Sequence, residues 1–292
     1  MQKLLVAALL AGSTALASAG DLLVSSAWLK ENFADPKMVL FHVGSKPDFD
    51  REHIPGAQLV NPQDLSVPRA EGALLMQLLL SGPLREKLEG LGVNDDSRVI
   101  IYFGTDQIHL TTRVYLSLDA AGLGERASVL DGGLPAWKAA GGAVTDVLKP
   151  VPAGRITVKP RPEVVIEADE LREGLGKGEL DVIDARLPEF FDGTSSGAMP
   201  RAGHIPGARS IPFSTLTTAD LRLKSDGELA GIFDAAGVKK GDTVASYCHT
   251  GQQATLVYFV AKRLGFAARV YDGSWDEWSR RSEFPVETTP VK

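Results

Sequence analysis

The sequence predicts an α/β protein made of two similar units, each a parallel sheet flanked by helices. Three observations lead to this fold class: the length of the chain, a repeat of short segments, and an alternation of apolar strands with helices. The chain has 292 residues, 44% of them hydrophobic, which is enough to bury two cores of ordinary domain size. We therefore expect two domains.

An internal repeat relates the two halves of the chain. Two short segments occur in the same order in each half, and the stretches between them also match. The recurring segments are His53-Ile54-Pro55-Gly56-Ala57 and His204-Ile205-Pro206-Gly207-Ala208, followed by Asp131-Gly132-Gly133 with Trp137 and Asp272-Gly273-Ser274 with Trp278. The repeat indicates a duplicated unit.

Each unit alternates strands with helices. In the second unit, residues 180–185, 243–247 and 268–271 have the composition of short apolar strands, and 252–264 has the apolar spacing of a helix. Strands and helices in this order, joined by short connections, predict a parallel sheet with helices on its faces.

The boundary between the units is expected at a proline-rich segment. Residues 149–162 contain four prolines, a composition typical of a linker. We place an N-terminal domain at 20–148 and a C-terminal domain at 163–292.

The start of the chain has the layout of a secretory signal peptide. One early cation, Lys3, precedes an apolar run at 4–10, and the small residues Ala17-Ser18-Ala19 follow. That run is too short to cross a bilayer, which requires roughly 20 apolar residues. We expect a signal peptide at 1–19 and a mature chain, not inserted in a membrane, in a bacterial periplasm or outside the cell.

Composition argues against several classes of partner. The formal net charge is −6, and Lys and Arg do not gather into a stripe, so nucleic acid is not expected. One cysteine and five scattered histidines cannot make a structural zinc site, and the glycines match neither a dinucleotide nor a P-loop motif. We expect no metal and no other cofactor, and the oligomeric state is left open.

The single cysteine, Cys248, follows the predicted strand 243–247 and precedes the predicted helix. A thiol at such a junction faces unpaired backbone N–H groups and the positive end of the helix dipole. Sites of this kind lower a thiol pKa from about 8.5 toward roughly 3.5 to 7.5. Gly251 lets the loop curl so that its amides point inward. These features favour a reactive thiol, and an inert, buried cysteine is the alternative.

The second unit resembles a rhodanese domain in four motifs that occur in the family's order. They are Asp184-Ala185-Arg186, Gly203-His204-Ile205-Pro206-Gly207-Ala208, the Cys-x-x-Gly loop at Cys248, and Asp272-Gly273-Ser274-Trp275 with Trp278. The similarity spans 21–286. The tandem arrangement resembles the thiosulfate and 3-mercaptopyruvate sulfurtransferases.

The resemblance implies a chemical role for the loop. Cys248 would attack the outer sulfur of a donor and hold it as a persulfide until an acceptor thiol or cyanide removes it. The loop amides would form an anion cradle, made of His249, Thr250, Gly251, Gln252 and Gln253. Relatives that hydrolyse phosphate esters carry an arginine six residues after the cysteine. Ala254 stands there in this chain, so a phosphatase is disfavoured.

The loop departs from both specific patterns of the family. Thiosulfate-specific members carry two cations directly after the cysteine, and mercaptopyruvate-specific members carry Gly-Ser, whereas this chain has His249 and Thr250. Thr250 falls where the latter group places a serine that relays a proton, so it either does likewise or is a solvated loop residue. An arginine that holds the donor in tandem members is replaced by Phe190.

The resemblance leaves other candidate contacts to an anionic donor. Arg186 and Arg201 are the nearby cations, and a structural ion pair that fixes the loop is the alternative for Arg186. Asp184 is expected to be a supporting partner at the strand end. Trp275 is a candidate wall of the donor pocket, although such aromatics are more often part of the core.

The first unit lacks a nucleophile. Phe103 occupies the position of Cys248, and His42-Val43-Gly44 replaces Asp184-Ala185-Arg186, so we infer a catalytically silent unit that forms one wall of the cleft. His53 is a candidate donor contact from this unit, as the matching histidine is in some relatives. A structural role in a capped turn is the alternative for His53 and for His204.

We therefore expect a sulfurtransferase that moves sulfane sulfur from an anionic donor, of the thiosulfate or 3-mercaptopyruvate type, to a thiol or cyanide through a Cys248 persulfide. A non-catalytic periplasmic sulfur carrier loaded by a partner protein is the second hypothesis. An oxyanion-binding structural module is the third.

Overall fold

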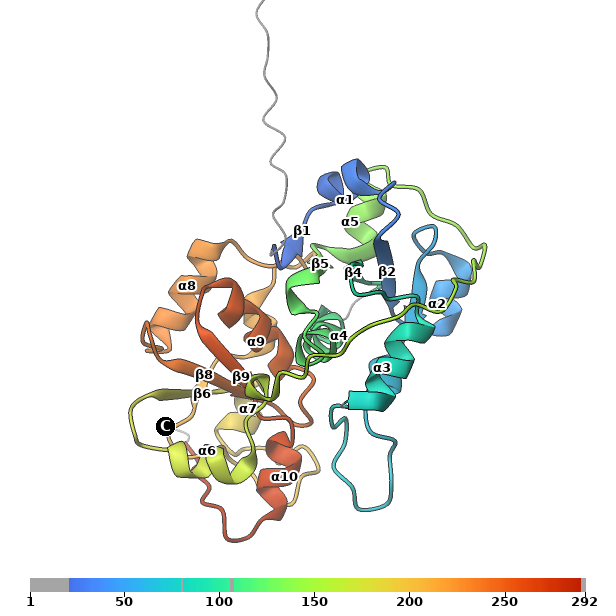
Figure 1. Ribbon diagram of the computed structural model, residues 1–292. Coiled ribbons are helices and arrows are strands. Elements are labelled where there is room, and N and C mark those ends of the chain that lie inside the picture. Colours follow the sequence, from blue (N-terminus) through green and yellow to red (C-terminus); the bar gives the residue numbers. More distant parts are fainter. Residues whose placement is uncertain (1–20, 80, 106–107, 290–292) are drawn as a thin grey trace, which may run out of the picture.

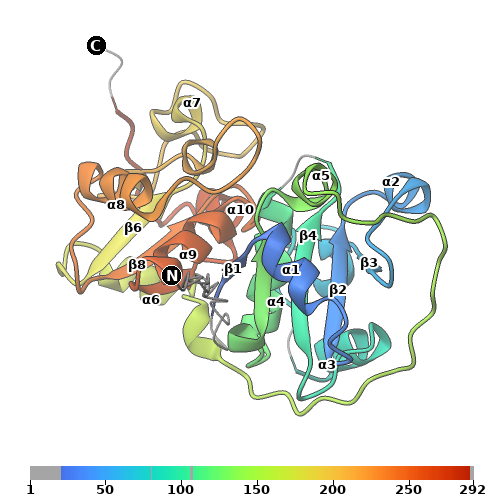
Figure 2. The same ribbon diagram turned by 90° about the horizontal axis from the view of Figure 1, so that it is seen from above.

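The computed structural model describes residues 21–79, 81–105 and 108–289, which form two α/β units side by side (Figure 1 and Figure 2). The expected signal peptide, 1–19, lies outside these residues. Within the described ranges, no helix combines the length and apolar character needed to cross a bilayer.

The first unit contains a five-stranded sheet in which all neighbouring strands are parallel. In spatial order its strands are β1 (Leu23–Val24), β5 (Ala127–Leu130), β4 (Arg98–Phe103), β2 (Met38–Val43) and β3 (Gln58–Val60). Its helices are α1 (Ser26–Asn32), α2 (Lys46–Arg51), α3 (Ser81–Gly90), α4 (Ile108–Ala120) and α5 (Gly133–Ala139), with 3-10 turns at Pro62–Leu65 and Gly124–Arg126.

The second unit contains a four-stranded sheet, again parallel throughout. In spatial order its strands are β7 (Arg209–Ser210), β6 (Leu180–Asp184), β8 (Thr243–Tyr247) and β9 (Ala267–Val270). Its helices are α6 (Ala168–Gly174), α7 (Pro188–Phe191), α8 (Asp226–Ala235), α9 (Ala254–Arg263) and α10 (Ser274–Arg280), with 3-10 turns at Pro162–Val164 and Phe213–Leu216. The predicted fold class, α/β with two parallel sheets flanked by helices, is confirmed.

The central strands explain why the sequence forms parallel sheets. In β4 and β8, every residue after the first is buried, as expected for strands with a neighbour on each side and helices on both faces. The tyrosine that lies in each strand also explains the repeated His-Ile-Pro-Gly segment. The amide of Ile54 donates a hydrogen bond to the Tyr102 hydroxyl at 3.0 Å, and the amide of Ile205 donates to the Tyr247 hydroxyl at 3.1 Å. The repeat thus ties the same turn to the same strand in each unit.

Helices α4 and α9 join the two units. Most residues of both helices are buried, because each packs on its own sheet with one face and on the other helix with the opposite face. Tyr115 of α4 meets Phe259 of α9 edge to face, with ring centroids 5.0 Å apart. One hydrophobic cluster runs through this contact from the first sheet to the second. The units therefore share a core.

A buried carboxylate adds a polar contact to this interface. Asp119 of α4 accepts hydrogen bonds from the Tyr258 hydroxyl and from Arg161, each at 2.6 Å, and pairs with Lys262. Tyr258 and Lys262 belong to α9, so four side chains from three segments meet at one point. Buried charges are stable only when they are paired in this way.

The repeated Asp-Gly segment also fastens the units to one another. Asp272 of the second unit accepts the amide of Leu78 at 2.7 Å, and Asp131 of the first unit accepts the amide of Leu223 at 3.1 Å. Each aspartate therefore holds a hairpin of the opposite unit. The interface is a pair of equivalent contacts, as expected from a duplicated chain.

The segment between the units has no regular structure at 146–161. Much of it stays attached to the first unit: the amides of Lys159 and Arg161 donate to the carbonyls of Ala121 and Ala120, at 3.0 Å and 2.9 Å. The domain boundaries placed at 148 and 163 stay a prediction.

Candidate active site

Cys248 stands at the carboxyl end of β8, between β6 and β9. Because all three strands are parallel, Asp184, Cys248 and Asp272 come to the same edge of the sheet, where ligands bind in folds of this kind. The cysteine is only 1% exposed and belongs to the shared hydrophobic cluster. In this conformation the cysteine is closed off from solvent, as the inert alternative also predicts.

Most carbonyl groups of Cys248 and the loop after it accept hydrogen bonds from neighbouring residues. The amide of Trp275 donates to the carbonyl of Cys248, and the amide of Asp276 donates to the carbonyl of His249, both at 2.9 Å. The carbonyl of Gly251 accepts a hydrogen bond from Arg113 at 3.3 Å. The amide of Thr255 donates a hydrogen bond to the carbonyl of Gln252 at 3.1 Å. The loop thus turns most of its carbonyls toward other segments.

The amides of the same loop are unpaired. Within the described part of the chain, none of the N–H groups of residues 249–253 donates a hydrogen bond to another residue. The amide of Cys248 itself donates to the Ser274 hydroxyl at 3.2 Å. An anion-binding backbone site at the start of a helix requires unpaired N–H groups of this kind.

Gly251 is required by the curvature of this loop. Its φ is +77°, and a Cβ at this position would lie 2.9 Å from the backbone oxygen of Asp272. Any other residue would combine the strain of a left-handed backbone with a steric clash.

His249 is neutral at physiological pH. Burial, with a smaller contribution from the charge of Arg186, lowers the pKa of His249 to about 4. Its ring lies edge-on to Phe190, with centroids 4.6 Å apart, and its Nε2 atom is buried without a hydrogen-bond partner. The residue directly after the cysteine therefore adds no positive charge to the loop.

Arg186 forms a structural ion pair, and within the described residues its Nη1 atom is buried without a hydrogen-bond partner. Its side chain is 0% exposed and forms a bidentate pair with Asp184, through Nη2 at 2.5 Å and Nε at 2.9 Å. The guanidinium also donates to the carbonyl of Gly203 at 2.7 Å and lies 4.6 Å from the centre of the Trp275 ring. Asp184 accepts the Tyr247 hydroxyl as well, at 2.6 Å. The structure thus places Arg186, Asp184 and Trp275 in one buried cluster beneath the loop.

Arg201 binds backbone carbonyls at the end of α10. Its guanidinium donates four hydrogen bonds of 2.6–3.0 Å, to the carbonyls of Trp278, Ser279, Arg281 and Phe284. It also anchors Trp275, whose indole donates to the Arg201 carbonyl at 2.9 Å. Four of the five N–H groups of the Arg201 guanidinium are therefore engaged with backbone carbonyls in this conformation.

The two motif histidines lie inside their own units. His53 is buried, contacts the carbonyl of Phe49 at 2.8 Å through Nδ1, and stacks on the Phe49 ring. His204 repeats this arrangement with Phe191, at 2.6 Å. Neither histidine is among the residues that line the two cavities described below. This geometry is that of the structural alternative.

Thr250 and Gln252 line a cavity of about 440 Å³ between the units. The opposite wall belongs to the first unit and includes Ser66, Arg69 and Met76. Arg69 is exposed and makes no hydrogen bond or ion pair with any residue that the structure describes. It is thus a free cation across the cavity from the cysteine loop.

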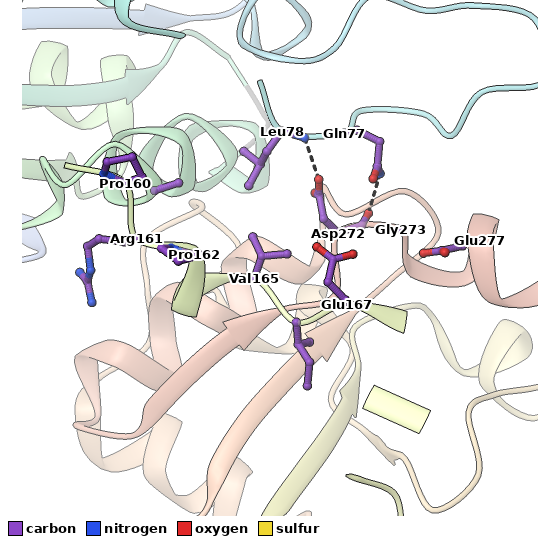
Figure 3. Close-up of a pocket in the computed structure, with 12 residues that line it drawn as sticks. Gln77, Leu78, Pro160, Arg161, Pro162, Val165, Glu167, Asp272, Gly273 and Glu277 are labelled. Carbon is purple, nitrogen blue, oxygen red and sulfur yellow. Dashed lines mark hydrogen bonds between the residues drawn. The ribbon is translucent and has the colours of Figure 1, made fainter. Parts of the chain in front are cut away.

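A second, smaller cavity of about 210 Å³ is lined by Asp272 together with Gln77 and Leu78 (Figure 3). Figure 3 shows the Asp272 carboxylate accepting the Leu78 amide, while the Gln77 side chain donates to the Asp272 carbonyl at 3.1 Å. The segment that ends at Leu78 is therefore held between the two cavities.

The sequence assigned no site role to Arg69 or Arg113. It marked Ser274 only as part of a repeated segment, and did not indicate its contact with the amide of Cys248. Ser274 lies in a repeated segment, which is a signal of structural importance. Arg69 and Arg113 belong to the unit without a cysteine, and no local pattern marks them. Their proximity to the loop depends on the packing of the two units.

Comparisons with known proteins agree with this architecture. The family model described as Rhodanese-like domain matches residues 25–140 and 167–281. The thiosulfate sulfurtransferase of Azotobacter vinelandii is 29% identical over 91% of this chain and 97% of that protein. The 3-mercaptopyruvate sulfurtransferase of Escherichia coli K12 is 29% identical over 92% of this chain and 98% of that protein. A solved 3-mercaptopyruvate sulfotransferase from Escherichia coli has a TM-score of 0.77 at 26% identity, covering 87% of this chain and 99% of that one.

Two rhodanese-like domains in one chain define the class of protein. The chain belongs to the rhodanese family, in the tandem form of the thiosulfate and 3-mercaptopyruvate sulfurtransferases.

We predict that His249 stays uncharged from about pH 8 down to about pH 5 in the folded protein. NMR spectra of the imidazole ring should show no titration in this range, because its pKa lies at about 4. In the unfolded chain this histidine binds a proton near pH 6.5, whereas in the folded chain it does so only near pH 4. The unfolded state therefore binds more protons between these values, and the free energy of unfolding decreases as pH falls from about 6.5 to about 4. A ring titration centred near pH 6.5 in the folded chain would contradict the prediction.

Proposed function

We propose that this chain transfers sulfane sulfur from an anionic donor to a thiol or cyanide through a persulfide on Cys248. The observation that carries the proposal is the run of five unpaired amides at residues 249–253, directly after the cysteine. Such amides stabilise a negative sulfur without reorganisation at the moment of reaction. The sulfurtransferases to which the chain is similar favour this enzyme over the sulfur-carrier alternative.

The chemistry proceeds in two displacement steps. In the first, the Cys248 thiolate attacks the outer sulfur of thiosulfate or the thiol sulfur of 3-mercaptopyruvate. A new S–S bond forms, and the old S–S bond of thiosulfate breaks to release sulfite, or the C–S bond of 3-mercaptopyruvate breaks and its carbon takes a proton to give pyruvate. In the second, an acceptor thiolate or cyanide attacks the outer sulfur of the persulfide. The electrons of that S–S bond return to Cys248 as a thiolate.

We assign the donor's anionic group to the cavity between the units. Arg186 and Arg201 are committed to structural contacts, and His249 is neutral. Arg69 then supplies the positive charge, and Thr250 with Gln252 supplies polar contacts from the loop. Because Cys248 is buried, donor entry requires the 66–76 segment or the loop itself to move.

We predict that Cys248→Ala abolishes sulfur transfer from every donor while the fold is kept. The wild type should gain the mass of one sulfur atom after incubation with thiosulfate or 3-mercaptopyruvate, measured by intact mass spectrometry, and the variant should not. Steady-state turnover with cyanide or a thiol separates an enzyme from a carrier. Absence of any mass gain across a panel of donors, or loading without turnover, would contradict the proposal.

We predict that Arg69→Gln raises the KM for an anionic donor by about tenfold, since a hydrogen bond to a charged group contributes about 1.5 kcal/mol or more. Its kcat should change little, because the loop and the cysteine are untouched. Arg85→Gln is the matched control: it removes another exposed arginine of the same unit that lines a different cavity. Equal KM values for the wild type and Arg69→Gln would remove Arg69 from the donor site.

We also propose that the chain is exported to the periplasm or secreted. The support is the sequence pattern of residues 1–19. Expression of the full chain in a bacterial host should yield a mature protein that starts at Gly20 in the periplasmic fraction. Recovery of the uncleaved chain from the cytoplasmic fraction alone would contradict export.

A further inference from the structure

We propose that Arg113, from the unit without a cysteine, is a positioning residue for the sulfur-carrying loop. It holds the carbonyl of Gly251 outward, so that the neighbouring amides stay open to an anionic sulfur. The inference deepens the proposed function and rests on it.

The geometry places one guanidinium at the meeting point of three segments. Arg113 lies in α4 and is 1% exposed. Its Nη1 donates to the carbonyl of Gly251 at 3.3 Å and to the carboxylate of Asp272 at 2.5 Å, and its Nη2 donates to the carbonyl of Met76. The loop, the segment after β9 and the hairpin of the first unit are thus joined by a single side chain.

The carbonyl of Gly251 depends on the other unit. The carbonyls of Cys248 and His249 are held by backbone amides of α10, and that of Gln252 is held by Thr255, all within the second unit. Gly251 has a left-handed backbone and, being a glycine, is free to rotate its peptide. Arg113 removes that freedom. If the peptide rotated, a carbonyl oxygen would replace an N–H in the cradle and repel an anion.

The ion pair with Asp272 makes the arrangement rigid. Asp272 accepts both Arg113 and the Leu78 amide, and Figure 3 shows its carboxylate turned toward the first unit. Removal of one member of a buried pair leaves an uncompensated charge. The guanidinium is planar and offers several donors in a fixed fork, whereas a lysine is a point charge. Lysine at position 113 keeps the charge for Asp272 but lacks this fork.

The duplicated interface offers a matched control. On the other side, Asp131 pairs with Arg222 at 3.3 Å and accepts the Leu223 amide. Arg222 is 40% exposed, and among its contacts in the described residues no carbonyl of the cysteine loop occurs. Substitution of Arg222 therefore disturbs the contact that the matching aspartate, Asp131, makes between the units without touching the loop.

The experiment compares wild type, Arg113→Lys, Arg113→Met and Arg222→Met. The rate of Cys248 alkylation by iodoacetamide is measured from pH 5 to pH 10 (about the range in which thiols ionise), together with single-turnover sulfur loading from thiosulfate. At neutral pH we expect Arg113→Met to lose about tenfold in both rates, comparable to one charged hydrogen bond, with its alkylation profile displaced to higher pH. Arg113→Lys should be intermediate, and Arg222→Met should match the wild type.

Two outcomes overturn the inference. One is a wild-type pH profile in Arg113→Lys, which keeps the buried charge and is the variant of choice if Arg113→Met does not fold. The other is an equal displacement in Arg222→Met, which would indicate a general loosening of the interface. If the wild type alkylates normally but no donor loads it with sulfur, the proposed function fails, while the profiles still decide the role of Arg113.

Discussion

The packing of α4 against α9 is the contact on which the site depends. It joins the two units in one hydrophobic cluster, and the cysteine loop directly precedes α9. Since α4 also carries Arg113, the same contact places a guanidinium beside the loop. A movement of one helix along the other would separate Arg113 from the Gly251 carbonyl. The unit without a nucleophile is therefore part of the site's framework.

Duplication explains both what the units share and where they differ. Both keep the bond between the tyrosine of the central strand and the isoleucine of the turn, and both use an aspartate to hold the opposite hairpin. The two units differ in the residues that follow or end the strand beside the central one. Asp184 and Arg186 form a buried ion pair in the second unit, whereas His42 is buried in the first with its pKa lowered to about 4, chiefly by burial. The first unit therefore shares these contacts with the second but has Phe103 at the position of Cys248.

Electrostatics explains how this site differs from the family patterns that it resembles. A cation next to the cysteine is absent because His249 is too buried to hold a proton. The arginines nearest in sequence stabilise the fold instead: Arg186 neutralises a buried carboxylate, and Arg201 binds the last carbonyls of α10. Across the cavity, Arg69 is the exposed cation that we propose for the donor. In this proposal a neutral loop uses its backbone dipoles together with a charge from the other unit.

The sequence by itself determined the features that depend on order along the chain. The repeat indicated two units, the apolar strands indicated parallel sheets, and the position of Cys248 between strand and helix indicated an anion-binding loop. Only the tertiary structure decided which side chains serve that loop. Arg186, Arg201 and His53 were candidate donor contacts in sequence, with structural alternatives for Arg186 and His53, and the structure places each in contacts within its own unit. Arg113 approaches Gly251 across 138 residues, and the burial of Cys248 results from the shared core. Local patterns carry no information about such contacts, because they arise from the way two finished units pack together.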